Sequence, residues 1–178
     1  SRADLAVKKG EMDNALSLHK KALEMQIKLR DAQGAARSYN NMGYIFRRQR
    51  DNKRAIEVYG NVEELLESED SPDLTEARIR LASAFLEMGE MDRARDHAMK
   101  AHDETAENNQ EKLHARSRAV LGRYYARIKD NDLAMHHYTG ALEILSDQSD
   151  PRSAVEVEIL LGQVLSDAGS TEEAAQHY

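Results

Sequence analysis

The stretch that decides the fold is Asp31–Tyr59, DAQGAARSYNNMGYIFRRQRDNKRAIEVY. Within it, the small residue Gly43 follows a methionine, and Phe46 comes three positions later. A short polar segment then leads to Ala55 and, four positions further on, to Tyr59. Because residues three and four apart share one face of a helix, this pattern predicts two amphipathic helices packed as an antiparallel hairpin. The small residues would let the two backbones approach, and the aromatic rings would fill the space that remains.

The same pattern recurs along the chain at a nearly constant period. The alanines Ala15, Ala55, Ala94, Ala134 and Ala174 are separated by 40, 39, 40 and 40 residues. Twelve positions before four of them stand Gly43, Ala82, Gly122 and Gly162. Three positions after these small residues come Phe46, Phe85, Tyr125 and Leu165. Self-similarity at such a period is typical of a repeat architecture in which each repeat is one helical hairpin.

Turn and cap signals mark the expected ends of the helices. The glycines Gly10, Gly89 and Gly169 are predicted to lie at the turn inside a hairpin, where the left-handed conformation is common. Arg50 and Lys129 occupy this place in the other repeats, so their turns should close differently or carry strain. The starts of first helices are predicted at Asp31, at Ser71 and at Asp150 with Pro151.

These residues resemble the tetratricopeptide repeat (TPR) in its longer form, as in Pins/LGN-like adaptors, kinesin light chains and prokaryotic TPR signalling proteins. The resemblance covers essentially the whole chain. It implies an all-α fold, a right-handed superhelical array of antiparallel helix hairpins, or TPR α-solenoid. The sequence departs from the family pattern at the tryptophan-like site, which holds Tyr39, Arg78, Arg118 and Glu158. The proline that ends the second helix in the family is also absent.

We expect one TPR domain over residues 1–178. It would consist of a partial repeat at 1–30 that is mainly a second helix, repeats at 31–70, 71–109 and 110–149, and a truncated repeat at 150–178. The chain begins with Ser1 and stops inside the last second helix, so it is expected to be a segment of a longer protein. An array that ends in this way exposes apolar surface that must be capped or dimerised.

Composition argues against several classes of function. The chain has no cysteine, which excludes disulfides, thiolate metal sites and a cysteine nucleophile, and which fits a cytoplasmic protein. Its apolar runs are too short to span a membrane. The net charge of −7 opposes binding to nucleic acid or to an anionic membrane. We therefore expect neither nucleic acid nor membrane among the partners.

No spacing of histidines or carboxylates predicts a metal site or an active site. The adjacent His136 and His137 would point about 100° apart on a helix, so they could not easily chelate one ion. Carboxylate pairs such as Glu63–Glu64 and Glu172–Glu173 are expected at exposed positions of second helices. We predict no enzyme activity, no metal and no cofactor. The tyrosines Tyr59, Tyr125 and Tyr138 are predicted to be core aromatics.

Charge is divided unevenly between the two helices of the repeats. The windows 36–49, 75–88, 115–128 and 155–168, which cover first helices, carry net charges of +3, 0, +4 and −3. The second-helix windows together carry −13. The resemblance implies that first helices line a concave groove. It also implies that an asparagine just before the hydrophobic–Gly pair hydrogen-bonds the backbone of an extended peptide, and Asn41 before Met42–Gly43 matches this place.

We therefore predict a groove for an extended, acidic or carboxylate-bearing peptide. A side-chain amide offers both a donor and an acceptor, and a guanidinium binds carboxylates through two hydrogen bonds. The candidate residues are Arg37, Asn40, Asn41, Tyr44, Arg47, Arg48, Arg80, Arg116, Arg123 and Arg127. The alternative for Asn40 is a local hydrogen bond to the neighbouring hairpin. The alternative for each arginine is a solvated charge or an ion pair between repeats.

The predicted function is a protein–protein interaction scaffold with a protein or peptide partner. Two alternatives stay open. The array could mainly self-associate as a homodimer. It could also be a peptide-sensing regulatory domain of a larger signalling protein.

Overall fold

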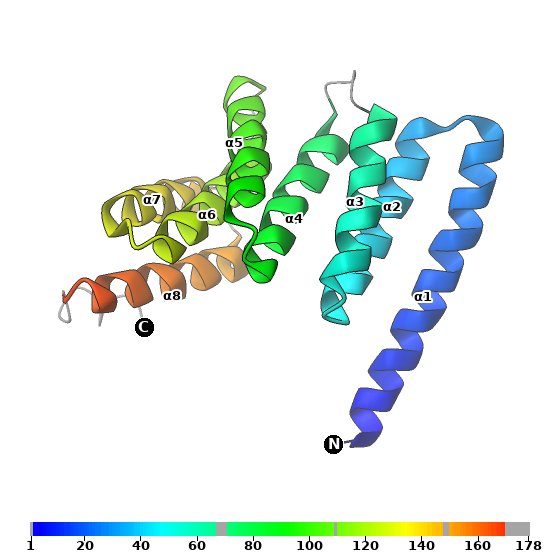
Figure 1. Cartoon of the computed structure of the whole chain (residues 1–178), viewed down its shortest axis with the longest axis horizontal. Helices are drawn as coiled ribbons and strands as arrows, with labels where there is room; N and C mark the ends of the chain where they lie inside the picture. Colours follow the sequence, from blue (N-terminus) through cyan, green and yellow to red (C-terminus); the bar gives the residue numbers. More distant parts are fainter. Residues whose placement is uncertain (1, 67–70, 109, 148–149, 170–178) are drawn as a thin grey trace. The chain divides into compact units, whose positions relative to one another are not determined.

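The computed structural model describes residues 2–66, 71–108, 110–147 and 150–169, with side chains from residue 10 onward (Figure 1). Within these ranges all regular secondary structure is helical, as predicted. The chain divides into two compact units, residues 1–88 and 89–178, which are described separately. No helix of the described ranges is both long and apolar enough to cross a bilayer.

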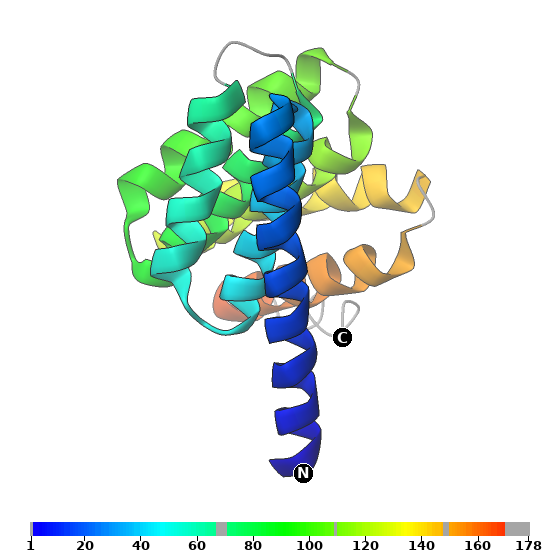
Figure 2. The ribbon, with the colours of Figure 1, turned by 90° about the vertical axis from the view of Figure 1, so that its right-hand side faces the viewer.

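The first unit contains four helices in series. They are α1 (Arg2–Leu29), α2 (Ala32–Arg48), α3 (Asn52–Leu66) and α4 (Pro72–Met88). Each helix packs against the next, and α2 also contacts α4. The first turns of α1 extend beyond the ends of α2 and α3 (Figures 1 and 2). α2 therefore has neighbours on three sides and is the central element of this unit.

The second unit repeats the arrangement. Its helices are α5 (Met91–Glu107), α6 (Glu111–Arg127), α7 (Asn131–Asp147) and α8 (Pro151–Asp167). α6 packs between α5 and α7 and also contacts α8, which makes it the counterpart of α2. The core beneath α6, α7 and α8 is built from small and aliphatic side chains around the buried ring of Tyr138.

The close approach predicted at Gly43 is present, and the residue that occupies the space is a tyrosine. A Cβ atom added at Gly43 would lie 2.3 Å from a ring carbon of the fully buried Tyr59. A Cβ atom at Gly122 would lie 2.6 Å from the ring of Tyr138. The tyrosine four positions after each repeat alanine thus fills the space over the glycine. The missing side chain of the glycine is what lets the ring lie against the helix.

The turns inside the hairpins share one backbone conformation. Gly89 and Gly169 have φ angles of 77° and 87°, whereas Arg50 and Lys129 have φ angles of 60° and 65°. The two basic residues therefore accept the left-handed conformation rather than closing the turn in another way. For residues with a side chain this conformation costs about 1–2 kcal/mol. These turns carry strain, which was one of the two predicted outcomes.

Hydrogen bonds explain why the strained turns close. The amide of Arg50 donates to the carbonyl of Arg47 over 2.9 Å, and the amide of Asp51 donates to the carbonyl of Phe46 over 2.9 Å. This pair of bonds is the Schellman motif, which satisfies the last carbonyls of a helix. The Asp51 carboxylate then accepts from the amide of Arg54 and so caps the start of α3. One short connection therefore ends one helix and begins the next.

The predicted starts of first helices agree with the structure. Asp31 caps α2 by accepting from the amide of Gly34 over 2.9 Å, and Asp150 caps α8 by accepting from the amide of Ser153 over 3.2 Å. Ser71 directly precedes α4, which begins at Pro72.

One turn prediction is wrong, and some predictions fall outside the described residues. Gly10 does not lie at a turn, because α1 runs through it as one helix from Arg2 to Leu29. A single glycine weakens a helix by about 1 kcal/mol relative to alanine but does not end it. The predictions for Ala174, Tyr178 and the Glu172–Glu173 pair lie outside the described residues.

Candidate functional site

The exposed face of α2 gathers four of the predicted site residues. Arg37, Asn41, Tyr44 and Arg48 are spaced by four, three and four residues, which places them on one stripe of the helix. All four side chains are exposed, and Tyr44 is 49% exposed. The opposite face of α2 is buried, with Ala36 and Met42 in the core of the unit. Burial of that apolar face is what presents the polar stripe to solvent.

The two adjacent asparagines have different surroundings. Asn40 is buried, and its Nδ2 donates to the backbone carbonyl of Asp73 at the start of α4 over 2.8 Å. This is the alternative predicted for Asn40, a hydrogen bond to the next hairpin, and it removes Asn40 from the exposed face. Asn41 is exposed, and its amide has no hydrogen bond within the described part of the chain. Only Asn41 is therefore available to a ligand.

Three of the predicted arginines are engaged in ion pairs in this unit. Arg37 lies 3.7 Å from the Asp73 carboxylate, and Arg47 pairs with Glu87. Both pairs join α2 to α4. Arg80 pairs with Glu76 one turn away on α4, and its guanidinium lies 5.4 Å from the centre of the Tyr44 ring. Much of the positive charge predicted for the groove therefore connects or orders neighbouring helices.

Beneath this face, the buried phenol of Tyr59 lies beside the partly buried guanidinium of Arg80. Burial raises the pKa of the Tyr59 phenol, and the nearby Arg80 guanidinium opposes that shift. Although burial alone would lower the pKa of Arg80, the adjacent Glu76 carboxylate raises it. The Tyr59 hydroxyl makes no hydrogen bond of good geometry among the described residues. Arg80 thus contributes to the packing around Tyr59 as well as to the surface.

In the second unit, α6 carries the remaining predicted arginines. Arg116, Arg123 and Arg127 lie on one stripe, because their spacings are seven and four residues. Arg116 and Arg123 are partly buried and interact with neighbouring groups, whereas Arg127 is exposed. At the end of this helix, Lys129 forms an ion pair of 3.4 Å with Asp167 of α8. The helices of this unit are again connected by charge.

Of the Glu63–Glu64 pair expected at exposed positions, Glu64 is exposed, whereas Glu63 is only partly exposed. Its carboxylate pairs with Arg78 of α4 over 3.1 Å, and the Arg78 side chain is only 12% exposed. Arg78 occupies the tryptophan-like site of its repeat. An ion pair between α3 and α4 therefore occupies the place where the family pattern has a large aromatic ring.

A basic pocket in the first unit was not predicted. It has a volume of about 1230 Å³ and lies where the end of α2 and the start of α3 meet α1 and α4. Its wall consists of Met12, Asp13, Leu16, Arg47, Arg48, Gln49, Arg50, Asn52, Arg54 and Glu87. The sequence signal that could have indicated it is the arginine at position 50, where two other repeats have glycine.

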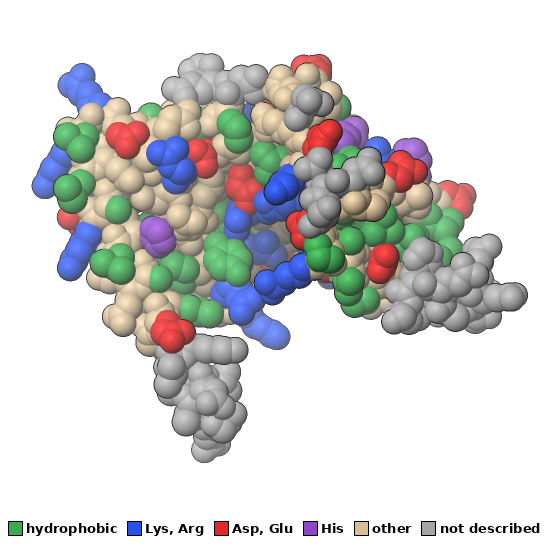
Figure 3. All heavy atoms as spheres, turned by 180° about the vertical axis from the view of Figure 1, so that it is seen from behind, with side chains coloured by type: hydrophobic (Ala, Val, Ile, Leu, Met, Phe, Trp, Pro, Cys, Tyr) green, Lys and Arg blue, Asp and Glu red, His purple; other side chains and the backbone are tan. Residues whose placement is uncertain are grey.

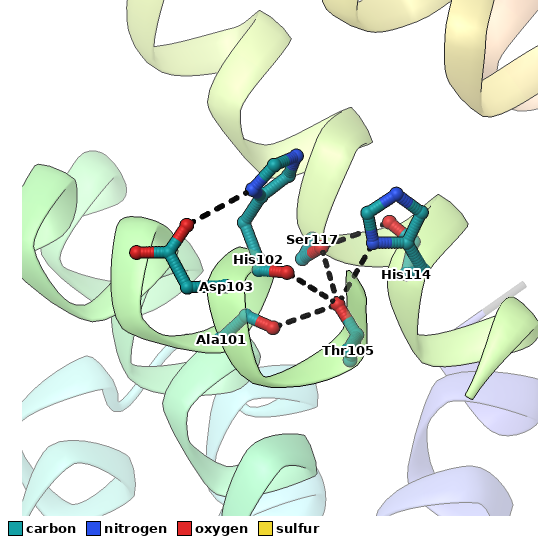
Figure 4. A network of polar contacts seen from close by, with 6 residues as sticks. All are labelled: Ala101, His102, Asp103, Thr105, His114 and Ser117. Atoms are coloured by element: carbon teal, nitrogen blue, oxygen red, sulfur yellow. Dashed lines mark hydrogen bonds and ion pairs between the residues drawn. The ribbon is translucent and has the colours of Figure 1, made fainter. Parts of the chain in front are cut away.

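A buried polar network joins α5 and α6 in the second unit (Figure 4). The Thr105 hydroxyl lies 3.0 Å from Nδ1 of His114 and 3.4 Å from the hydroxyl of Ser117. Ser117 donates to the backbone carbonyl of His114 over 2.8 Å. Thr105 and Ser117 are both almost completely buried. Because their hydroxyls have partners, these polar groups are tolerated within the core.

Histidines from three helices surround this network. The ring centroid of His102 lies 4.9 Å from that of His114 and 5.9 Å from that of His137. His137 stacks on Tyr125, with the two rings nearly parallel. Tyr125 is only partly buried and packs against the core, whereas Tyr59 and Tyr138 are core residues, as predicted. No cluster of three possible metal ligands occurs among the described residues.

Burial and positive charge lower the pKa of two of these histidines, His137 and His114. Burial lowers the pKa of His137 to about 4, and Arg118 and His102 add to the shift. Burial and His102 also lower the pKa of His114. The Arg118 guanidinium donates to the carbonyl of His136 over 3.1 Å and lies against Gly140, where a Cβ atom would overlap it. A protonated His137 would thus face a fixed positive charge.

The outer surface of α1 combines apolar and basic side chains, which reach the surface at the left of Figure 3. Leu18, Met25 and Leu29 are 66%, 63% and 75% exposed, and their spacing places them on one stripe. In α3, forty positions later, the residues equivalent to Leu18 and Ala22 are Val58 and Val62, which are buried. Leu18 therefore has a buried equivalent in α3, whereas Leu65, the residue equivalent to Met25, is 40% exposed.

Comparison with known proteins agrees with the repeat pattern. Residues 1–68 match the family model described as tetratricopeptide repeat. No curated protein sequence gives a significant match. The predicted resemblance to TPR proteins is thus found directly in the first repeats.

Solved structures extend the resemblance along the chain. BtubC (BKLC) from P. vanneervenii is 25% identical, with 98% of this chain and 73% of that chain covered at a TM-score of 0.83. A kinesin light chain-like protein of Podosopora anserina with nearly identical TPR-like repeats is 17% identical, with 96% and 84% covered at a TM-score of 0.73. The Rap conjugation gene regulator of the plasmid pLS20, solved in complex with the Phr* peptide, is 18% identical, with 98% and 49% covered at a TM-score of 0.77. The chain therefore has the fold of TPR-like helical repeat proteins and spans about half of the Rap regulator.

Proposed function

We propose that this TPR-type chain is a protein–protein interaction scaffold whose exposed α2 face binds an extended peptide segment of a partner. The observation that carries the proposal is the exposed amide of Asn41, which has no partner within the described residues. Asparagine weakens a helix interior, and the neighbouring Asn40 already supplies the hydrogen bond to α4. Asn41 therefore has no structural role that accounts for it. Its amide can both donate to and accept from a peptide backbone.

The surroundings of Asn41 suit an extended chain. Tyr44, one turn further along α2, offers a half-exposed ring, and Arg48 follows with an exposed guanidinium. Such an arrangement of an amide, a ring and a cation can hold a peptide backbone, an apolar side chain and a carboxylate. The complex of the Rap regulator with a peptide supports peptide binding on this fold.

A preference for acidic peptides is the finer part of the proposal. Arg37 and Arg47 are largely neutralised by Asp73 and Glu87, so they attract an acidic segment only weakly. The attraction would come from exposed arginines, Arg48 in the first unit and Arg127 in the second. We further propose that the chain acts without catalysis or cofactor and in the cytoplasm.

The test is a display selection of random peptides on the wild type and on two asparagine variants. Asn41→Ala removes the amide from the α2 face, and Asn14→Ala makes the same change at an exposed position of α1. Both substitutions raise the helix propensity by a similar amount. A difference in peptide binding between the two variants therefore comes from the loss of the Asn41 amide. We expect the Asn41→Ala variant to lose the enriched peptides and the Asn14→Ala variant to keep them. Equal enrichment on both variants would overturn the α2 site.

Arg123→Glu extends the test to the second unit. If the α6 stripe also attracts acidic peptides, this charge reversal should deplete them from the selected pool. If the pool does not change, peptide binding belongs to the first unit alone.

Self-association is the second candidate function, because of the exposed stripe on α1. Leu18, Met25 and Leu29 are large apolar side chains that are exposed on one stripe of α1. A second copy that covers this stripe would remove apolar surface from water. Sedimentation should then show a mass that rises with concentration and returns to that of a monomer in a Leu18→Glu/Met25→Glu variant. A monomeric wild type at all concentrations would exclude this candidate.

A further inference from the structure

The basic pocket of the first unit holds two arginines in place and leaves two without partners. Arg54 is fixed by Asp51, which accepts from its Nε over 2.6 Å, and its guanidinium lies 4.6 Å from the centre of the Phe46 ring. Arg47 is fixed by Glu87. Neither Arg48 nor Arg50 has an ion pair or side-chain hydrogen bond within the described residues, and both are exposed at the pocket wall.

Arg50 has a strained backbone conformation, which raises the question of what its side chain contributes. Arg50 has a φ of 60° at a position where the equivalent residues Gly89 and Gly169 relieve the strain. Lys129, the other basic residue at this position, has an ion pair with Asp167 of α8. Arg50 has no such contact among the described residues, and its side chain borders the pocket instead. A strained backbone conformation that no contact of the side chain explains indicates a functional position.

The charges of the pocket wall do not cancel. Four arginines face two carboxylates, those of Asp13 and Glu87. Glu87 is occupied by Arg47, and Asp13 accepts a hydrogen bond of 3.2 Å from Gln49. The net positive charge is therefore concentrated on the two arginines without partners. Guanidinium groups of this kind bind oxyanions through pairs of hydrogen bonds.

The size and lining of the pocket indicate the occupant. About 1230 Å³ exceeds the usual volume of a small-ligand site, roughly 300–1,000 Å³, and far exceeds a single phosphate ion. Met12 and Leu16 of α1 add apolar side chains to the lining. A short stretch of polypeptide with both acidic and apolar side chains matches this combination of space, charge and apolar surface.

We propose that this pocket is an oxyanion-binding subsite for the partner peptide, in which Arg48 and Arg50 hold adjacent carboxylates or a phosphorylated side chain. Arg54 and Arg47, held by Asp51 and Glu87, form a fixed part of the wall, and the two arginines without partners close on the ligand. The inference rests on the proposed function, because the oxyanions belong to the same peptide that contacts Asn41. It locates the acidic preference at the end of α2 rather than along the whole α2 face.

The experiment uses three labelled ten-residue peptides and fluorescence anisotropy. The acidic probe contains five glutamates, two leucines and three serines, and the neutral probe has glutamine in place of every glutamate. A third probe carries one phosphoserine in the neutral sequence. The test protein is Arg48→Gln/Arg50→Gly, in which glycine keeps the left-handed turn. The control is Lys129→Gly/Arg152→Gln, which makes the matched backbone and charge changes outside the pocket.

We expect the wild type and the control to bind the acidic or phosphorylated probe at least tenfold more tightly than the neutral probe. The Arg48→Gln/Arg50→Gly protein should lose that preference while it keeps the affinity for the neutral probe. The preference should also weaken as salt rises from 0.05 M to 0.3 M, because exposed charges are screened. Comparison of the acidic and phosphorylated probes identifies which oxyanion is preferred.

Other outcomes separate this inference from the proposed function. If the acidic preference persists in the double variant, the pocket is not the subsite. If the wild type binds the acidic and neutral probes equally tightly and Asn41→Ala weakens the binding of both, the proposed peptide binding stands and the pocket inference fails. If the wild type binds none of the three probes, both are overturned. Hydrogen exchange shows where the probe binds. When the acidic probe is bound, we expect the backbone amides of residues 12–16 and 47–54 to be protected.

Discussion

The Tyr59 ring lies directly against Gly43, with only 2.3 Å between a ring carbon and the place where a Gly43 Cβ would be. Tyr59 is fully buried and cannot move away without displacing the core of the first unit. Gly43→Ala should therefore destabilise the protein by about 1–2 kcal/mol, because overpacking of about 1–3 kcal/mol outweighs the helix propensity gained by alanine. Urea unfolding followed by circular dichroism measures this loss.

Gly60→Ala is the matched control for that change. Gly60 also lies inside a helix, and a Cβ atom there would meet nothing within 4 Å. The substitution should stabilise α3 by roughly 0.5–1 kcal/mol, the difference in propensity between the two residues. If both variants change stability in the same direction, the contact with Tyr59 is not the reason for glycine at position 43.

The repeat pattern was sufficient to predict this contact in outline. It identified the small residue, the aromatic and their helices, because each recurs at the same place in successive repeats. It did not identify which side chain covers the glycine. In the repeat with Ala82 in place of glycine, the residue at the tyrosine position is Ala98. This covariation between repeats was the available signal that glycine and tyrosine belong together.

Asn40→Ala and Asn41→Ala should have opposite effects on stability. The first removes a hydrogen bond of 2.8 Å between α2 and α4 from a buried site, so a loss of about 1 kcal/mol is expected. The second removes an exposed amide without a described partner, and the better helix propensity of alanine should make it neutral or stabilising by up to about 0.5 kcal/mol. Thermal unfolding of the two single variants provides the comparison. A destabilising Asn41→Ala would reveal a structural role for Asn41.

The two asparagines also define what sequence could not predict. Their identity and position were clear, but the side of the helix that meets α4 depends on how one hairpin packs on the next. The same limit applies to Arg37–Asp73 and Arg78–Glu63, in which each partner lies on a different helix. Charge counts for single helices treated Arg37 as part of a basic surface and gave no sign of a partner for Arg78. Packing converts them into ion pairs.

The strained turns should respond to glycine. Lys129→Gly relieves a left-handed conformation that costs about 1–2 kcal/mol, against an entropic cost of about 0.5–1 kcal/mol for glycine in the unfolded chain. A net gain of up to about 1 kcal/mol is expected, reduced slightly by loss of the exposed pair with Asp167. Gly89→Ala makes the reverse change and should destabilise. Chemical unfolding of both variants tests the prediction, and a stable Gly89→Ala protein would contradict it.

Stability should fall when His114 and His137 of the second unit become protonated. The pKa of His137 is lowered to about 4 and that of His114 is also lowered, so the unfolded chain binds these protons more readily than the folded one. The stabilising contribution is complete above the ordinary pKa near 6.5 and is lost as the pH falls toward 4. The physical reason is burial, together with the charge of Arg118 close to His137.

The measurement is the urea midpoint between pH 7.5 and pH 5.0, a range chosen to stay above the titration of most carboxylates. The wild type should lose stability steadily below about pH 6.5. His137→Gln removes the main titrating group, so its midpoint should depend less on pH even if its stability at pH 7.5 is lower. His19→Gln, in the first unit, serves as the control and should keep the slope of the wild type. If His137→Gln and the wild type have the same slope, proton uptake at His137 does not control the stability of the second unit. The comparison of slopes separates this effect from the packing lost with the His137 ring, which stacks on Tyr125.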